Sequence, residues 1–264
     1  MVEWWKIILL GAVEGFTEFL PISSTGHLLI VAKWLHFQEN AGGTFEIFIQ
    51  LGAMLAVIGY YARDLIAQAQ AVTHDGGIRR FWLNIVLAFL PAAVIGFLLR
   101  NWIKAVLFAS PTVIAWAFII GGLVLLAVEW LPKRLVTTKD TVQITRRQAI
   151  LTGFAQVLAL VPGVSRSGAT IVGGMLAGVD RAAATRFSFY LAIPTLLAAT
   201  SYDLLKSINH LTANDIGGLA LGTIVAMITA WFSIGWLLRY IANHTFVPFG
   251  IYRIIAGVLI LWLM

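Results

Sequence analysis

The sequence predicts an all-α, polytopic integral membrane protein from three features: its composition, its long apolar runs, and two interruptions within such runs. Of the 264 residues, 60% are hydrophobic and 11% are charged, and the mean hydropathy is +0.90. A soluble domain averages about 25% charged residues, because its surface needs polar cover that this chain lacks. The composition therefore excludes a water-soluble enzyme and a disordered protein.

Six uninterrupted apolar runs are close to the length that crosses a bilayer as a helix, about 20 residues. We expect transmembrane helices near 45–61, 82–99, 112–130, 187–205, 217–238 and 249–264. Together with the two segments described next, they form a single predicted membrane domain, 1–264.

Two further apolar segments, 5–32 and 149–178, are interrupted by proline, glycine and polar residues. The interruptions read Pro21-Ile-Ser-Ser-Thr-Gly-His27 and Pro162-Gly-Val-Ser-Arg-Ser-Gly168. Irregular backbone at membrane depth is tolerated only where protein buries it or where it lines a wet cavity. We therefore predict two re-entrant helical hairpins whose tips lie inside the bilayer.

The two hairpins belong to a predicted internal repeat with a constant offset of 142 residues. Without a gap, Ser23 aligns with Ser165 and Gly26 with Gly168. Repeat 1 covers about 1–132 and repeat 2 about 148–264, and each holds one hairpin followed by three spans. Because three crossings are an odd number, the second half is inverted, and the hairpins are expected to oppose each other.

Basic residues fall mainly in the loops that this topology places on one side of the membrane. Arg79, Arg80, Lys133, Arg134, Arg146 and Arg147 are among them. Because cytoplasmic loops carry an excess of Lys and Arg, this side is expected to be cytoplasmic, with both termini outside and the site open to the outer side. The net charge of +6 then reflects loops facing anionic lipid rather than nucleic-acid binding.

Glu14 and Glu18 lie in the first interrupted segment, four residues apart and so on one face of a helix. Carboxylates inside a bilayer are costly and mark functional sites. The pair suits a divalent cation held by oxygen ligands, or a general base beside a metal ligand. The alternative is that one of them simply pairs with Arg166. The chain contains no cysteine, which excludes thiolate metal sites and cysteine nucleophiles.

The first interruption adds Ser23, Ser24, Thr25 and His27 directly after these carboxylates. Hydroxyls bind phosphate oxygens, or act as nucleophiles beside a base, and histidine can be nucleophile, acid or base. Helix capping is the alternative for the hydroxyls, and it is as good an explanation for Ser23 and Thr25. We favour a functional role for Ser24 and His27, which lie nearest to the expected cavity.

The second interruption combines glycines and hydroxyls with one intramembrane arginine. Free amides at a helix N-terminus attract anions, and a guanidinium fits phosphate oxygens. The predicted anion-binding residues are Gly163, Ser165, Arg166, Ser167, Gly168 and Thr170. The alternative is a broken transporter helix with capping serines.

Glu46 lies near the start of a predicted span, with Gln50 one turn later. They either support the site from behind its metal ligands or lie at its rim.

Taken together, opposed hairpins would bring carboxylates, hydroxyls and a histidine opposite an arginine-bearing anion site. This arrangement suits hydrolysis of a phosphate ester or anhydride, and its depth in the bilayer implies a substrate with a lipid tail and a diphosphate head.

The motifs Glu14-Gly-Phe-Thr-Glu-Phe-Leu-Pro-Ile-Ser-Ser-Thr-Gly-His27 and Pro162-Gly-Val-Ser-Arg-Ser-Gly-Ala-Thr170 resemble those of the undecaprenyl-diphosphatase family, the bacitracin-resistance type of membrane phosphatase. The segments 44–46 and 248–253 are also similar. The resemblance implies removal of the terminal phosphate of undecaprenyl diphosphate in the bacterial inner membrane. It further implies recycling of the lipid carrier for peptidoglycan synthesis, bacitracin resistance, and a divalent cation, Mg²⁺ or Ca²⁺, as cofactor.

By this resemblance the catalytic residues are Glu14, Glu18, Ser24, His27 and Arg166. We expect the two glutamates to hold the cation or one of them to act as base, and Arg166 to hold the diphosphate. Attack comes from Ser24 or from a water beside it, and His27 moves a proton. The alternative function is a lipid-phosphate flippase, because inverted repeats with broken helices are typical of transporters. The expected partners are the lipid substrate and membrane lipids, and a homodimer is left open.

Overall fold

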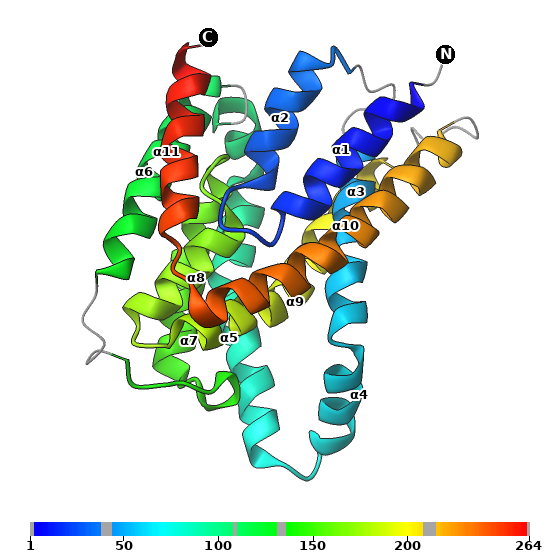
Figure 1. Cartoon of the computed structure of the whole chain (residues 1–264). Coiled ribbons are helices and arrows are strands. Elements are labelled where there is room, and N and C mark those ends of the chain that lie inside the picture. Colours follow the sequence, from blue (N-terminus) through cyan, green and yellow to red (C-terminus); the bar gives the residue numbers. More distant parts are fainter. Residues whose placement is uncertain (1–2, 38–43, 108–109, 131–135, 208–214, 263–264) are drawn as a thin grey trace.

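The computed structural model describes residues 3–37, 44–107, 110–130, 136–207 and 215–262, and within these ranges it contains helices and no β-strand. Figure 1 shows the helices packed as a bundle, with both chain ends at the same end of the molecule. The predicted all-α class is confirmed. Lys133 and Arg134, two of the basic residues behind the predicted orientation, lie outside the described residues.

The six predicted spans all coincide with helices, although these differ in length. Helices long and apolar enough to cross a membrane are α5 (Gly76–Trp102), α6 (Pro111–Glu129), α9 (Arg181–Ser207) and α10 (Ile216–Asn243). Helices α3 (Thr44–Tyr60) and α4 (Ala62–Ala71) reach that length only as a pair bent by 64°. Helix α11 (Val247–Trp262) is shorter, with 16 residues. Length and composition therefore support four or five spans in the described part of the chain.

Both predicted hairpins are present, and they approach each other from opposite ends of the bundle (Figure 1). The first consists of α1 (Trp4–Thr17) and α2 (Ser24–Trp34). The second consists of α7 (Arg146–Val157), a short 3₁₀ turn at Leu158–Leu160, and α8 (Arg166–Leu176). Their tips meet within the bundle, so the polar interruptions of the sequence lie side by side.

The two tips share the same local backbone. Ser23 and Ser165 precede α2 and α8 as N-caps, with φ values of 72° and 76°. Each serine Oγ accepts a hydrogen bond from the amide three residues later, that of Gly26 in the first tip and Gly168 in the second. This capping bond satisfies one amide at the start of each helix and offsets the strain of a positive φ. The two tips therefore share one capping geometry, while the repeat with its bounds stays a prediction.

Each hairpin packs mainly on a long helix from the other half of the chain. A Cβ at Gly11 of α1 would lie 2.8 Å from the Gly222 carbonyl oxygen of α10. Likewise, a Cβ at Gly153 of α7 would lie 2.5 Å from the Ala88 carbonyl oxygen of α5. Small residues let membrane helices approach until their backbones touch. The halves are thus interlocked, and neither hairpin is buried by its own half alone.

The burial pattern differs from that of a soluble protein both on the outer surface and in the interior. Large apolar side chains are exposed along the outside of the bundle, among them Phe97, Trp116, Phe232 and Trp236. Charged and hydroxyl side chains are buried inside it, among them Glu14, Ser167, Thr170 and Arg253. An apolar belt around an interior that adds buried charged and hydroxyl groups to its apolar core is the arrangement expected of a protein in a bilayer, and the buried polar groups mark the functional region.

Candidate active site

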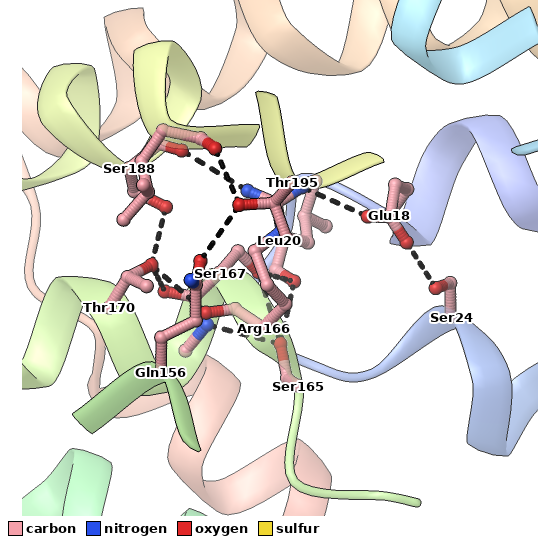
Figure 2. A network of polar contacts seen from close by, with 12 residues as sticks. Glu18, Leu20, Ser24, Gln156, Ser165, Arg166, Ser167, Thr170, Ser188 and Thr195 are labelled. Atoms are coloured by element: carbon pink, nitrogen blue, oxygen red, sulfur yellow. Dashed lines mark hydrogen bonds and ion pairs between the residues drawn. The ribbon is translucent and has the colours of Figure 1, made fainter. Parts of the chain in front are cut away.

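Glu18 joins the two hairpin tips (Figure 2). Its Oε1 accepts a hydrogen bond from Arg166 Nη2 at 2.9 Å, and its Oε2 accepts one from Ser24 Oγ at 2.5 Å. The exposed fractions of the Glu18 and Arg166 side chains are 6% and 11%. Because little solvent screens them, these charge-assisted bonds are strong. The alternative given above, that one glutamate pairs with Arg166, therefore describes Glu18, although the same carboxylate also accepts a hydrogen bond from the Ser24 hydroxyl.

Arg166 is held on more than one side. Its Nη1 donates to the Ser188 carbonyl oxygen at 3.2 Å, and its guanidinium lies over the Phe19 ring, 5.6 Å from the centroid. Its Nε is buried and has no hydrogen-bond partner among the described residues. The guanidinium is thus fixed in place while retaining a donor for a further acceptor, such as a phosphate oxygen.

The second tip's serines connect the tips to each other. Ser167 Oγ donates to the Leu20 carbonyl oxygen at 2.7 Å and lies 3.0 Å from Ser165 Oγ. The Ser165 hydroxyl and the Gly168 amide are bonded to each other at 3.1 Å in the capping contact. The capping alternative therefore describes Ser165, whose hydroxyl also donates to the Leu20 carbonyl oxygen at 3.5 Å, and Ser167 is the shorter link between the hairpins.

Thr170 and Gly163 lie next to Arg166 without pointing at Glu18. The Thr170 hydroxyl is fully buried, 2.9 Å from the Arg166 carbonyl oxygen and 2.7 Å from Ser188 Oγ. Gly163 has a φ of 93°, a conformation that favours glycine, and makes the turn that leads into the tip. Both residues shape the backbone that carries Arg166.

The first tip divides its polar residues between capping and other contacts. Ser23 caps α2, as described above, and Thr25 is half-buried, with no side-chain hydrogen bond to the described residues. His27 Nδ1 lies 2.6 Å from the Ser23 carbonyl oxygen, and its Nε2 lies 2.5 Å from Tyr252 Oη. Since a carbonyl only accepts, we assign the proton to Nδ1, and Tyr252 then donates to Nε2. Both ring nitrogens are thus engaged away from Ser24.

Glu14 lies one helical turn before Glu18 and is 2% exposed. Its carboxylate receives no hydrogen bond from the described residues, although Glu18, Glu46 and Arg166 are all within electrostatic range. Glu46 is exposed and lines a small cavity between α1, α2 and α3, and Gln50 is half-buried. These two residues lie beside the Glu18 cluster, and no hydrogen bond joins them to it within the described residues.

The donor set fits a hydrated divalent cation. No group of three His, Asp or Glu side chains that could enclose a metal occurs within the described ranges. Mg²⁺, however, usually keeps several waters and is bound by one or two carboxylates together with substrate phosphates. Glu14 is a buried carboxylate whose oxygens accept no hydrogen bond from the described residues, and it lies next to a second carboxylate, Glu18, so the two meet that requirement.

Three residues of this region carry contacts that the sequence motifs alone did not assign: Ser188, Tyr252 and Arg253. Ser188 aligns with Glu46 at the offset of the repeat, which is the signal that could have identified it. Tyr252 and Arg253 belong to the similar tail segment 248–253, and a buried arginine in an apolar helix is itself a functional signal.

Comparisons with known proteins agree over the whole chain. The family model described as bacitracin resistance protein BacA matches residues 7–259. Undecaprenyl-diphosphatase 3 of Acinetobacter baylyi is 47% identical, covering 100% of this chain and 98% of its own. The undecaprenyl-diphosphatases of Methylococcus capsulatus and Methylobacillus flagellatus are 47% and 49% identical, over 98% and 97% of this chain and 94% and 96% of their own. With this match and this geometry, the chain belongs to the bacitracin resistance protein BacA family.

Proposed function

We propose that this chain hydrolyses undecaprenyl diphosphate to undecaprenyl phosphate and inorganic phosphate within the bacterial membrane. The observation that carries the proposal is the Glu18 carboxylate, which bridges a hydroxyl of one tip and a guanidinium of the other. The names of the relatives, all undecaprenyl-diphosphatases, favour hydrolysis over the flippase alternative.

Ser24 is the proposed nucleophile and Glu18 its base. The arrangement follows the general pattern of an activated nucleophile, in which a base binds the hydroxyl and a third group orients the base. Ser24 Oγ forms a bond to the terminal phosphorus while the bond from that phosphorus to the bridging oxygen breaks. The Ser24 proton passes to Glu18, and undecaprenyl phosphate leaves with the bonding electrons. Water then hydrolyses the phosphoserine; in the direct route, a water in place of Ser24 attacks.

Arg166 holds the terminal phosphate and balances its charge during transfer. In the resting site part of its charge is directed at Glu18, 2.9 Å away. When Glu18 takes up the Ser24 proton, this ion pair loses its negative partner. The guanidinium charge is then available to the phosphoryl oxygens while the phosphoryl group is being transferred. The unpartnered Nε–H offers one further donor.

We propose that His27 and Tyr252 relay a proton, since they are hydrogen-bonded to each other and His27 also contacts the Ser23 carbonyl oxygen. The imidazole is neutral in the assigned tautomer, with its Nδ1–H directed at the Ser23 carbonyl oxygen. Tyr252 Oη donates to Nε2 at 2.5 Å, so a proton can pass from the partly exposed tyrosine to the imidazole and back. A divalent cation, when bound, supplies charge neutralisation, and Glu14 with Glu18 would hold it.

We also place the site on the outer side of the membrane. The hairpin α1–α2 enters from the end of the bundle where both chain ends lie, and the α4–α5 connection lies at the opposite end (Figure 1). Arg79 and Arg80 lie in the first turns of α5 next to that connection, and Arg63 lies at the start of α4. The positive-inside rule then supports a cytoplasmic α4–α5 end and outward termini.

The test is a quenched single turnover of the purified protein in detergent with a prenyl diphosphate labelled in its terminal phosphate. We expect label on the wild-type chain and none on Ser24→Ala, whose turnover falls by at least about 10³-fold. The control is Thr200→Val, because Thr200 is a buried hydroxyl of α9 bonded only to its own helix. Near-normal turnover of Ser24→Ala would exclude Ser24 as nucleophile, and an inactive variant without label on the wild type would favour direct attack by water.

A further inference from the structure

Arg253 is the most completely engaged cation of the described interior. It lies in α11, is 1% exposed, and forms no ion pair with a carboxylate of the described residues. Each of its five N–H donors meets a backbone carbonyl oxygen instead. The acceptors are Phe118 for Nε at 3.4 Å, Pro21 and Val164 for Nη1 at 3.0 and 2.9 Å, and Ala117 and Gly163 for Nη2 at 2.9 and 2.9 Å.

These acceptors come from three separate parts of the fold. Pro21 belongs to the tip of the first hairpin, and Gly163 and Val164 belong to the tip of the second. The remaining two carbonyls lie inside α6. Carbonyls at a helix interruption have lost the amide that would bond to them four residues later, and hydrocarbon offers no water in its place. One guanidinium therefore donates hydrogen bonds to carbonyl oxygens of both interruptions and connects both to α6.

Only arginine suits this position. The guanidinium is planar and presents five donors in a fixed fork, whereas lysine has three donors on a flexible stem. The neighbouring helix also makes room for it. A Cβ at Gly121 of α6 would lie 2.1 Å from Arg253 Nη2 and 2.6 Å from Cζ. Gly121 and Arg253 thus form one unit, and the guanidinium keeps its place only while residue 121 has no side chain.

We propose that Arg253 is a positioning residue that fixes the two tips relative to each other, so that Ser24 and Glu18 face Arg166. Its acceptors Pro21 and Val164 lie within three residues of those groups on either tip. The contact between Glu18 and Arg166 also joins the tips, but the substrate competes for it during each turnover. All the hydrogen bonds of Arg253 go to backbone carbonyls and none to the side chains of Ser24, Glu18 or Arg166, and so it keeps the tips aligned while Arg166 engages phosphate. This inference rests on the phosphatase function proposed above.

The first test compares Arg253→Lys and Gly121→Ala with the wild type in phosphate release per folded protein. We expect kcat to fall by about 10²-fold or more in both variants, because a displacement of about 1 Å is enough for such a loss. We expect KM to change by less than about threefold, since Arg166 itself is intact. The matched control is Arg181→Lys, because Arg181 is a partly buried arginine at the start of α9 that bonds to Glu129 and to the His244 carbonyl oxygen. This control is expected to lower the melting temperature and to retain kcat.

The second test needs no substrate. The chain has no native cysteine, so spin labels at Trp34→Cys and Leu176→Cys, both exposed at the outer ends of the hairpins, report the distance between the hairpins. We expect one narrow distance distribution in the wild type and a broadened or shifted one in Arg253→Lys. A wild type without phosphate release would refute the proposed function, while these distances would still test the positioning.

Two outcomes would overturn the inference. One is a kcat within about threefold of the wild type in both variants, together with unchanged distances. The other is loss of folded protein in both variants while Arg181→Lys folds, which would assign Arg253 to stability alone. Gly121→Ala guards against an uninformative result, because its Cβ meets the far end of a flexible side chain rather than backbone.

Discussion

Replacing Glu18 by glutamine tests the centre of the proposed reaction, because it changes the charge and the proton-accepting ability of one side chain while preserving its shape. A glutamine oxygen can still accept from Arg166, so the contact between the tips is kept. The amide cannot take the proton of Ser24, which lies 2.5 Å from Oε2 in the wild type. Assayed at saturating Mg²⁺, so that weaker cation binding does not limit the rate, Glu18→Gln therefore separates the role of Glu18 as base from its role in holding the hairpins together.

The expected loss follows from the contribution of a general base, about 10²–10⁴ in rate. This corresponds to about 3–5 kcal/mol of transition-state stabilisation. KM is expected to stay level or to fall, since Arg166 no longer shares its charge with a carboxylate 2.9 Å away. The assay is initial-rate phosphate release by the purified protein in detergent over a range of prenyl diphosphate concentrations, normalised to folded protein.

Glu129→Gln is the matched control. Glu129 is as buried as Glu18, with 3% of its side chain exposed, and it also pairs with an arginine, Arg181. It lies away from both tips, where it accepts the Phe246 amide at 2.7 Å. We expect this variant to melt at a lower temperature with kcat unchanged. A Glu18→Gln enzyme within tenfold of the wild-type kcat, or one impaired only in KM, would refute Glu18 as the base.

Two further predictions concern the cation and the packing. Chelation of divalent cations is expected to suppress phosphate release. Glu14→Gln is expected to raise the Mg²⁺ concentration needed for half-maximal activity, because Glu14 is a buried carboxylate with no hydrogen-bond partner among the described residues. A Mg²⁺ titration checks both expectations, and an unchanged midpoint for Glu14→Gln would remove Glu14 from the metal site. Gly15→Ala is expected to destabilise the protein by about 1–3 kcal/mol, because its Cβ would lie 2.1 Å from Thr229 Oγ1 and 2.2 Å from the Ala226 carbonyl oxygen. This lowers the melting temperature by about 2–10 °C, and thermal unfolding in detergent that stays within about 1 °C of the wild type would contradict the close approach of α1 to α10.

Much of the architecture could be predicted because the bilayer limits what an apolar chain can do. Continuous apolar runs had to be helices, and the two polar interruptions had to be buried in protein. The repeat offset placed the interruptions at matching positions, and opposed hairpins then brought Glu18 towards Arg166. The number of spans was harder to derive, since the first run bends by 64° between α3 and α4 and the last helix has only 16 residues.

The division of labour within the site could not be read from the sequence. Glu14 and Glu18 share a helix face, and only the turn into the tip decides which of them reaches Arg166. The partner of His27 is 225 residues away in α11, and no local pattern connects such distant positions. Hydroxyl side chains are equally suited to capping and to binding, so the capping role of Ser165 became visible only with the backbone in place.

The interlocked halves have a consequence for how the protein is made. Arg166 is separated from Glu18 by 148 residues of chain, and at the usual pace of synthesis, about 5–20 residues per second, it follows about 7–30 s later. During that interval the first hairpin exists without its counter-charge and without α10, the helix that covers it. The first hairpin therefore cannot reach its final packing while the chain is made only this far. It takes its final depth only when the youngest helices arrive.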